Sequence, residues 1–451
     1  MRSKLLKLRW LLPLVFLVLL GLAILLPPIV HNYEFPTTGD DTAHHLAVLD
    51  DVQFGHGFTD DFYHRYHGQT ITGWMIDLTG ANTDTFFLWF NFIGLFAIGL
   101  AIFIFASKLV NYYAGVFATL IAMFVFPGMM VYFQSGTVYN IINMYLLGLI
   151  GFGLLIYWVR TWKWYYGAGS LVMFLICGMV HSSTGFYILG TVGLFIVILA
   201  AYRVWRKQYG KAMWLGLFEA GVGITNFILP YFLLKDFADI VHGRSWFPPI
   251  SAPTIAGFGS QLVLTSGLIL MGLAAVFLVI LYRRGHLHAP PMIGTTLLLL
   301  LCLVAVLGIG AFGGIGIDPN RFALDLSVSL GILTGCALGW VVKEDKTKQL
   351  VCLFTPIVLI GCVPLMMLWF GYNSSIRPAD MEAVRYLNRL ECSSYSVSSQ
   401  IAPWVYERFL EKDYVAKDGD FVIYRTEPMT YQCRADSVQF RREKESVVAT
   451  R

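Results

Sequence analysis

The stretch "WLLPLVFLVLLGLAILLPPIVHNYEFPTTGDD" runs from Trp10 to Asp41 and joins two unlike segments. Residues 10–30 are apolar enough to cross a bilayer, which takes about 20 such residues. The preceding "MRSKLLKLRW" is basic, and Pro27-Pro28 makes a poor site for a signal peptidase. We therefore expect an uncleaved helix that anchors the chain in a membrane, with a pair of carboxylates shortly beyond its end.

The rest of the chain has the composition of a polytopic membrane protein. Of its 451 residues, 57% are hydrophobic and 13% are charged, whereas a soluble domain carries roughly 25% charged residues. Apolar runs predict about eleven spans. We place them near 10–30, 86–107, 110–132, 137–159, 164–181, 183–202, 212–234, 260–282, 291–312, 322–342 and 350–370. The sixth span depends on a break at "HSSTG" (181–185), and without it the count would be even.

Basic connectors alternate with neutral or acidic ones along these spans. An excess of Lys and Arg marks cytoplasmic loops, so the N-terminus is expected inside. The net charge of +4 is no sign of nucleic-acid binding, because the basic residues sit in short connectors. The basic connectors carry Lys108, Arg160, Lys163, Arg203, Arg206, Lys207, Lys211, Arg283, Arg284, Lys343, Lys346 and Lys348.

The predicted fold is mainly α: a transmembrane helical bundle with a small C-terminal domain. Residues 1–370 form the membrane domain, in which 31–85 is the first extracytoplasmic loop. Residues 371–451 alternate helix-like and strand-like stretches, which predicts a small extracytoplasmic α/β domain. Of seven cysteines, Cys392 and Cys433 lie in this tail and form the plausible disulfide pair. The other five lie in apolar runs and are expected to be packing residues: Cys177, Cys302, Cys336, Cys352 and Cys362.

The first outer loop concentrates carboxylates and imidazoles. Its first pair, in "TTGDDTAHHL", is Asp40-Asp41, and the spacings Asp40/His44 and Asp41/His45 are both i,i+4, on one helix face. One interpretation is structural, with Asp41 capping a surface helix. The other is chemical: an Asp beside the membrane serves as general base, or Asp40, Asp41 and His44 hold Mg²⁺ or Mn²⁺. The later pairs, Asp50-Asp51 and Asp60-Asp61, favour the structural interpretation.

A second polar group opens the tenth predicted span. "GGIGIDPNRFALDLSV" places Asn320 and Arg321 at its outer mouth. An Arg there can snorkel or form an ion pair, but its planar fork of donors also suits a phosphate. Three weaker candidates support this site. Tyr139 and Asn140 are expected at an outer turn in "YFQSGTVYN", His181 lies at membrane depth, where ionisable groups are suspected of function, and Arg244 lies in an outward connector.

Together these motifs resemble the GT-C superfamily of integral-membrane glycosyltransferases. "GDDTAHH" occupies the place of the family's acidic motif in the first outer loop, and "NRFALDL" is a degraded form of an Arg-aromatic motif of the "RYLLPL" kind. The odd span count and a tail opening "RPADMEAVRYL" add to the resemblance. Two features depart from the family. The late motif lacks its proline, having Ala323, Leu324 and Asp325, and the tail lacks the Trp-Trp-Asp signature of oligosaccharyltransferases.

The resemblance implies an inverting sugar transfer at the extracytoplasmic side of a prokaryotic plasma membrane. The donor would be a polyprenyl-phosphate-linked sugar and the acceptor a glycan, lipid or protein. Asp40 or Asp41 would deprotonate the acceptor hydroxyl, while Arg321 neutralises the departing phosphate. The missing signature favours transfer of one or a few sugars. The main alternative is a transporter or lipid flippase, although those proteins usually bury ionisable residues in several spans and show repeated halves.

Overall fold

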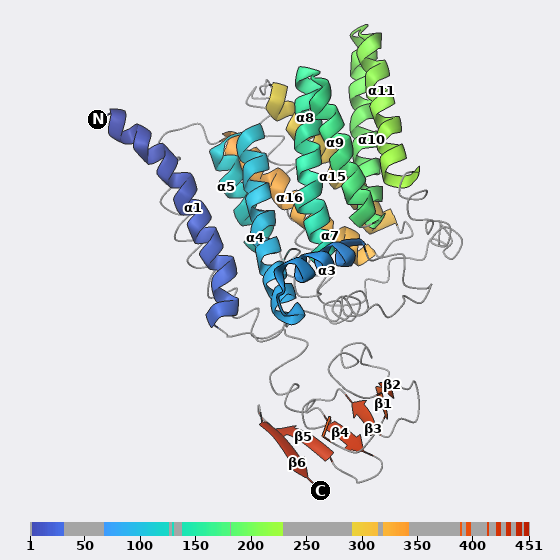
Figure 1. The fold of residues 1–451 in the computed structure, drawn as a ribbon. Coiled ribbons are helices and arrows are strands. Elements are labelled where there is room, and N and C mark those ends of the chain that lie inside the picture. The colour runs from blue at the N-terminus through green and yellow to red at the C-terminus, as the bar shows by residue number, and fades with distance from the viewer. Residues whose placement is uncertain are drawn as a thin grey trace.

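The computed structural model describes most of the helical part of the chain and the strands of its tail. The described residues are 2–30, 67–125, 129, 138–180, 182–228, 291–313, 319–341, 388–389, 394–397, 413–414, 421–424, 430–433, 439–443 and 446–450. These residues are mainly helical (Figure 1).

The helices follow one another with short turns. They are α1 (Arg2–Val30), α3 (His67–Thr79), α4 (Thr83–Leu109), α5 (Tyr112–Leu120), α7 (Val138–Ile142), α8 (Leu149–Thr161), α9 (Trp164–Val180), α10 (Ser182–Trp205), α11 (Tyr209–Gly223), α15 (Pro291–Gly313) and α16 (Pro319–Val341). Three π-helical segments continue them without a break: η2 (Ile121–Val125) after α5, η3 (Asn143–Gly148) between α7 and α8, and η4 (Ile224–Ile228) after α11.

Apolar sequence explains why these segments are helices. In a bilayer every backbone polar group must be satisfied within the protein, and a helix does this within one segment. Within the described part of the chain, four helices are long and apolar enough to cross a membrane: Thr85–Leu109, Asn143–Thr161, Tyr187–Trp205 and Pro291–Gly310. Shorter apolar helices lie at Pro13–Leu26, Tyr112–Phe124, Trp164–Gly178 and Leu324–Trp340.

The helices agree with the predicted spans where both can be compared. α4, α10, α15 and α16 begin within about three residues of the expected starts, which is the usual uncertainty of helix ends. The expected break at 181–185 is real but shorter, since α9 ends at Val180 and α10 begins at Ser182. The predicted spans 260–282 and 350–370 lie outside the described residues, so the total of about eleven stays a prediction.

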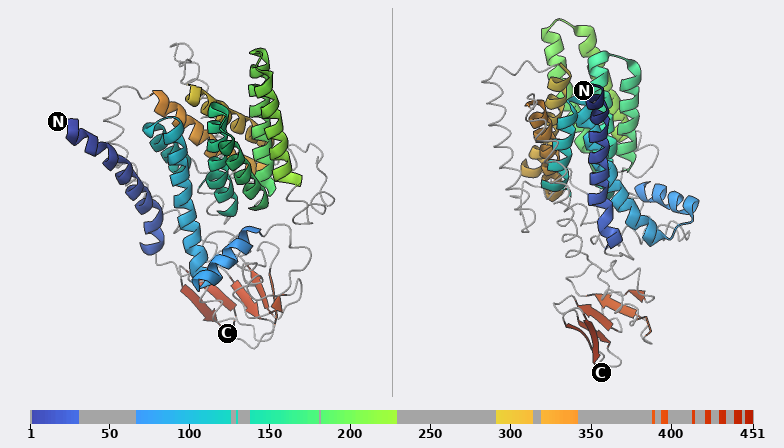
Figure 2. Two further views of the ribbon diagram at one scale, coloured as in Figure 1. Left: turned by 45° about the horizontal axis from the view of Figure 1, so that its top comes forward. Right: turned by 90° about the vertical axis from the view of Figure 1, so that its left-hand side faces the viewer.

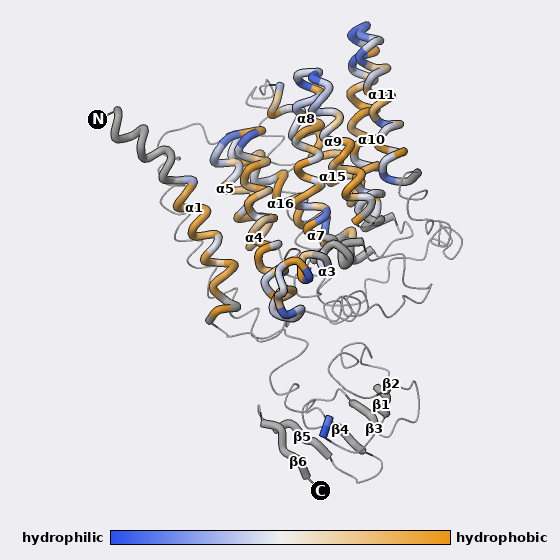
Figure 3. The backbone as a smooth tube through the Cα atoms, in the orientation of Figure 1, coloured by the Kyte–Doolittle hydropathy of each residue, from blue (hydrophilic) through white to orange (hydrophobic). Residues whose placement is uncertain are grey.

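The basic ends of several helices gather at one end of the bundle. Lys108, Arg160 and Arg203 lie in the last turns of α4, α8 and α10, and these turns form the hydrophilic upper end in Figure 3. The guanidinium of Arg203 and the ammonium of Lys211 lie over the Trp162 ring, 5.8 and 5.6 Å from its centroid. Such mixed aromatic and basic belts are typical of a membrane interface.

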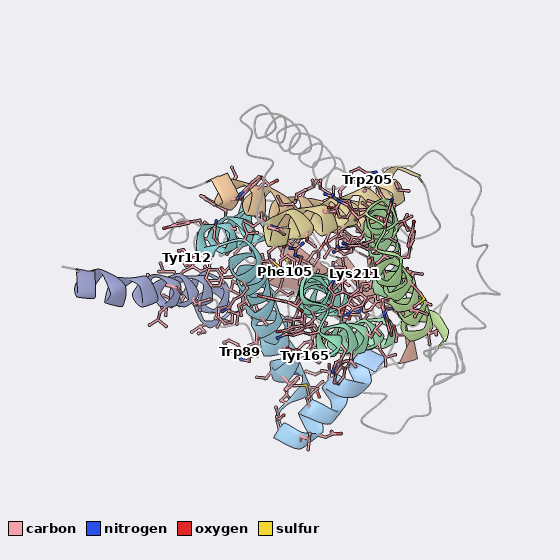
Figure 4. The ribbon with its side chains drawn as sticks, turned by 90° about the horizontal axis from the view of Figure 1, so that it is seen from above. Trp89, Phe105, Tyr112, Tyr165, Trp205 and Lys211 are labelled. Atoms are coloured by element: carbon pink, nitrogen blue, oxygen red, sulfur yellow. The ribbon has the colours of Figure 1, made fainter. Side chains whose placement is uncertain are left out.

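Aromatic side chains surround this end. Tyr165, Trp205 and Lys211, labelled in the end-on view of Figure 4, come from α9, α10 and α11. Trp164 and Trp205 are 77% and 74% exposed. By the positive-inside rule this end is predicted to face the cytoplasm. The opposite end, where α1 ends and α4 and α16 begin, is then predicted to face outward (Figures 1 and 2).

The closest helix contact joins α16 to α5. Gly331, Gly335 and Gly339 face Ala122, Ala118 and Ala114, so a glycine every four residues meets an alanine every four residues. A Cβ on Gly331 would lie 2.8 Å from the Cα of Ala122. Small residues at such spacing let two membrane helices approach closely. Asn111 closes one end, accepting from the Ala114 amide at 2.9 Å and donating to the Gly339 carbonyl oxygen at 2.8 Å.

The tail contributes a six-stranded sheet. Its strands are β1 (Ser394–Val397), β2 (Asp413–Tyr414), β3 (Phe421–Tyr424), β4 (Thr430–Cys433), β5 (Gln439–Glu443) and β6 (Ser446–Thr450), in the order β2-β1-β3-β4-β5-β6. β1 pairs in parallel with β2 and β3, and the remaining pairs are antiparallel. β1 and β3 fall in the two stretches expected to be strands. The expected tail helices lie outside the described residues, so the α/β domain and its boundary at 370/371 stay predictions.

Three of the five cysteines expected to pack within the apolar spans are buried and free: Cys177, Cys302 and Cys336. This confirms the expectation for them. Cys352 and Cys362 lie outside the described residues.

Candidate functional site

One continuous helical run, residues 138–161, contacts both elements that carry the predicted motifs. It consists of α7, η3 and α8. Near its start, Tyr139 reaches α3, which belongs to the predicted first outer loop. Six residues later, Tyr145 reaches α16, which begins with the Arg-aromatic motif. The run therefore links the first loop and the late motif at one end of the bundle.

The contact with α3 is a buried hydrogen bond within an aromatic cluster. The Tyr139 hydroxyl donates to Oγ1 of Thr72 at 2.8 Å, and both residues are buried. The Tyr139 ring lies 6.1 Å from that of Phe87 and 5.6 Å from that of Phe90, both on α4. These contacts hold α3 across the start of α4. The interpretation of Tyr139 and Asn140 as turn residues was wrong, because both lie in helix α7.

The contact with α16 involves a buried carboxyl group. The Tyr145 hydroxyl donates to the main-chain oxygen of Asp325 at 2.7 Å, and the Asp325 carboxyl oxygen Oδ1 lies 3.1 Å from the same hydroxyl. The Ser329 hydroxyl is 3.4 Å away. All three side chains are at most 5% exposed. A polar group inside an apolar bundle is stable only when it finds such partners.

The π-helical segment η3 lies between these two tyrosines and contains Tyr145. In a regular helix each residue advances by about 100°, so residues six apart point in different directions. A π turn shifts that phase further, and such turns are frequent at functional sites. The geometry explains how one helix can reach α3 with one tyrosine and α16 with the next.

The first turn of α16 is anchored by the aromatic residue of the motif. The Phe322 ring lies 4.7 Å from that of Tyr187 on α10, in an edge-to-face arrangement. Phe322 also fills the space beside Gly310 on α15, where a Cβ would collide with its ring. The backbone of Asn320 and Arg321 lies in this same turn, because α16 begins at Pro319. Proline is favoured at a first helical position because its missing N–H needs no partner there.

A further polar group surrounds the junction of α9 and α10. The Asn143 side chain donates to the Cys177 carbonyl oxygen at 2.7 Å. Asn226 Oδ1 lies 3.1 and 3.3 Å from the places where a Cβ would stand on Gly178 and Gly185. These two glycines leave room for Asn226 on both sides of the junction. His181, the residue at the junction, lies outside the described residues.

Several predicted site residues lie outside the described residues. They are Asp40, Asp41, His44, His45, Arg244 and Cys392, besides His181. Cys433 ends β4. Within the described part of the chain, no group of His, Cys, Asp and Glu could hold a metal ion. The proposed ligands Asp40, Asp41 and His44 fall outside that search, so the metal site stays a prediction.

Reasoning from sequence did not select Thr72, Tyr145, Asn143 or Asn226, and noted Asp325 only where the motif lacks its proline. Asp325 and the two asparagines share a signal that could have found them, since polar residues inside apolar spans are costly and usually have a role. Tyr145 and Thr72 carry no such signal, because tyrosine and threonine are ordinary residues in membrane helices.

The fold is similar to that of solved membrane glycosyltransferases. The apo oligosaccharyltransferase of Archaeoglobus fulgidus is matched with a TM-score of 0.56 and 12% identity over 90% of this chain and 64% of that chain. Its complex with Zn and sulfate gives a TM-score of 0.55 at 11% identity, over 89% and 62%. The archaeal oligosaccharyltransferase AglB from the same organism, with an inhibitory peptide and a dolichol-phosphate, gives 0.52 at 11% identity, over 88% and 63%.

These likenesses confirm the resemblance to the GT-C superfamily at the level of the fold. This chain spans just under two thirds of the length of those oligosaccharyltransferases. No protein-family model and no curated protein matches the sequence.

Proposed function

We propose that this protein is a membrane glycosyltransferase that uses a lipid-linked sugar. The observation that carries the proposal is the fold, which resembles an oligosaccharyltransferase over 90% of this chain. One of the similar structures holds a dolichol-phosphate and another an acceptor peptide. For this chain we propose a polyprenyl-phosphate-linked sugar as donor and a glycan, lipid or protein as acceptor.

The reaction is a single displacement at the anomeric carbon. Asp40 or Asp41 takes the proton of the acceptor hydroxyl, and the oxygen attacks the anomeric carbon. The bond from that carbon to the phosphate oxygen breaks, and the polyprenyl phosphate leaves with the electron pair. The product has the inverted configuration. Arg321 stabilises the departing phosphate through charge and paired N–H donors.

A divalent cation is a second way for the acidic pair to act. Asp40, Asp41 and His44 are the residues proposed to hold Mg²⁺ or Mn²⁺, which would neutralise charge on the phosphate. The similar structure with Zn and sulfate is compatible with this idea. Carboxylate and imidazole are ordinary ligands for such ions.

The described helices support a site at the outward end of the bundle. The run 138–161 ties α3 of the first loop to α16 of the late motif through Tyr139 and Tyr145. The opposite end carries the basic and aromatic belt. We therefore place the catalytic site on the extracytoplasmic side of a prokaryotic plasma membrane, in a domain spanning residues 1–370, with the tail 371–451 on the same side.

The alternative function is a transporter or lipid flippase, and one assay separates the two. The purified protein is placed in liposomes with a polyprenyl-phosphate sugar labelled in the sugar, together with candidate acceptors. A glycosyltransferase releases polyprenyl phosphate and moves the label to an acceptor. A flippase moves the intact labelled lipid between leaflets and releases no polyprenyl phosphate. Movement of the lipid without any release would contradict the proposal.

A further inference from the structure

Asp325 is a carboxyl group in an otherwise apolar part of α16. It is 5% exposed, and its partners among the described side chains are the hydroxyls around Tyr145. The Tyr145 hydroxyl has a single proton, which its shorter contact directs to the Asp325 main-chain oxygen at 2.7 Å. A buried carboxylate that is ionised needs a cation or several donors close by. Asp325 therefore calls for a positively charged partner.

The position of Asp325 in the motif supplies one. The Arg-aromatic motif that the sequence resembles has proline where this chain has Asp325. Arg321 precedes it by four residues in the same helix. Side chains four apart share one helix face, and an aspartate can pair with an arginine there. Because side chains lean toward the helix N-terminus, a carboxyl group at 325 is directed back along the turn that begins at 321.

The surroundings hold this part of α16 in place. Tyr145 bonds to Asp325 and approaches Ser329 on the next turn. Phe322 packs against Tyr187 and Gly310. Two neighbouring helices and η3 thus contact the segment between Arg321 and Ser329. A carboxyl group so held can fix a flexible partner, because its own position costs no further ordering.

We infer that Asp325, held by Tyr145, is the positioning residue for Arg321 at a site for a lipid monophosphate. Asp325 accepts part of the guanidinium fork. Arg has five N–H donors, so the remaining ones stay directed at the phosphate oxygens. This inference rests on the proposed function, and it deepens it by naming the residue that orients the phosphate ligand.

The test measures preference for a phosphate in the full-length protein. A short polyprenyl phosphate and the matching polyprenol are titrated in detergent micelles, with intrinsic tryptophan fluorescence as readout. The ratio of the two affinities isolates the contribution of the phosphate. The variants are Asp325→Asn, Tyr145→Phe, and Asp325→Asn in an Arg321→Ala background. Ser327→Ala is the matched control, a buried α16 hydroxyl with no hydrogen-bond partner within the described part of the chain.

We expect Asp325→Asn to lower the phosphate preference by about tenfold, the usual effect of losing one hydrogen bond to a charged group. This loss is expected even though the variant has one negative charge fewer. Tyr145→Phe should lower the preference by a smaller factor, and Ser327→Ala should leave it unchanged. In the Arg321→Ala background, Asp325→Asn should have no further effect. A merely structural role would weaken both ligands equally.

Two results would count against these ideas at different levels. If the wild-type protein showed no preference for the phosphate, the proposed donor, and with it the proposed function, would be contradicted. If the wild-type preference were present but unchanged or raised in Asp325→Asn, the positioning role alone would be wrong. An equal loss in the Arg321→Ala background would also overturn that role. Should Asp325→Asn fail to fold, Tyr145→Phe is judged by the same criteria.

Discussion

The Tyr145 hydroxyl lies 2.7 Å from the main-chain oxygen of Asp325 and 3.1 Å from its carboxyl oxygen. These residues are 180 positions apart in the sequence. The bond joins the middle of the run 138–161 to α16, whose first turn carries the predicted phosphate ligand. The same run bonds to α3 through Tyr139. Any change in this helix is therefore expected to affect both predicted motifs.

The bond between α7 and α3 should contribute measurably to stability. Tyr139→Phe removes the hydroxyl that donates to Thr72 and leaves a buried Oγ1 without this partner. We expect a loss of about 0.5–1.5 kcal/mol in the free energy of unfolding, as is typical of a single hydrogen bond. Thermal unfolding in detergent measures it. In a double-mutant cycle with Thr72→Val the two losses should not add, and full additivity would show that the bond contributes nothing.

The close contact between α16 and α5 depends on glycine. Gly335→Ala places a Cβ against the backbone at Ala118, and such overpacking costs about 1–3 kcal/mol. Gly308→Ala on α15 is the matched control, because nothing lies within 4 Å of its added Cβ. There alanine should be neutral or should stabilise the helix by up to about 1 kcal/mol. Equal unfolding temperatures for the two variants would contradict the described packing.

The sequence predicts the helical segments well because apolar length is a local property. The starts of α4, α10, α15 and α16 were expected within about three residues, as was the separation of α9 from α10. The π-helical segments were not predicted. They arise where the phase of one helix must adjust to its neighbours, which no local pattern of residues reveals.

The candidate site was predictable only in part for the same reason. Arg321 was selected because a charged residue in an apolar chain is conspicuous. Tyr145 was missed, because its role comes from a partner on α16 that is distant in sequence. The error at Tyr139 has a similar cause: "QSGTVYN" has the composition of a turn, but burial against Phe87 and Phe90 favours a helix.

Arg321 should contribute to binding of the donor rather than of the acceptor. Arg321→Lys keeps the charge and loses the bidentate fork, so transfer should fall. Arg321→Ala should weaken donor affinity more than acceptor affinity. Steady-state kinetics with each substrate varied in turn measures both. An unchanged KM for the donor in Arg321→Ala would show that Arg321 does not contact its phosphate.

The tail should lie outside the cytoplasm and contain a disulfide between Cys392 and Cys433. Such bonds persist in oxidising compartments. A membrane-impermeant thiol reagent, added to intact cells after reduction, should label both cysteines. Mass spectrometry of the unreduced protein should show the linked peptides. Labelling from the cytoplasmic side alone would reverse the predicted topology, and two free thiols in the unreduced protein would exclude the bond.

The central claim is that the acidic pair beside the first helix carries out the chemistry. Asp40→Asn and Asp41→Asn are nearly isosteric, and Asp50→Asn and Asp60→Asn are matched controls in the same loop. Turnover of a polyprenyl-phosphate sugar by the purified variants in lipid is the direct measurement. We expect at least one of the first two to lose about 10²–10⁴ in rate, with donor binding retained, while both controls stay near wild type. Full activity in both Asp40→Asn and Asp41→Asn would contradict the mechanism.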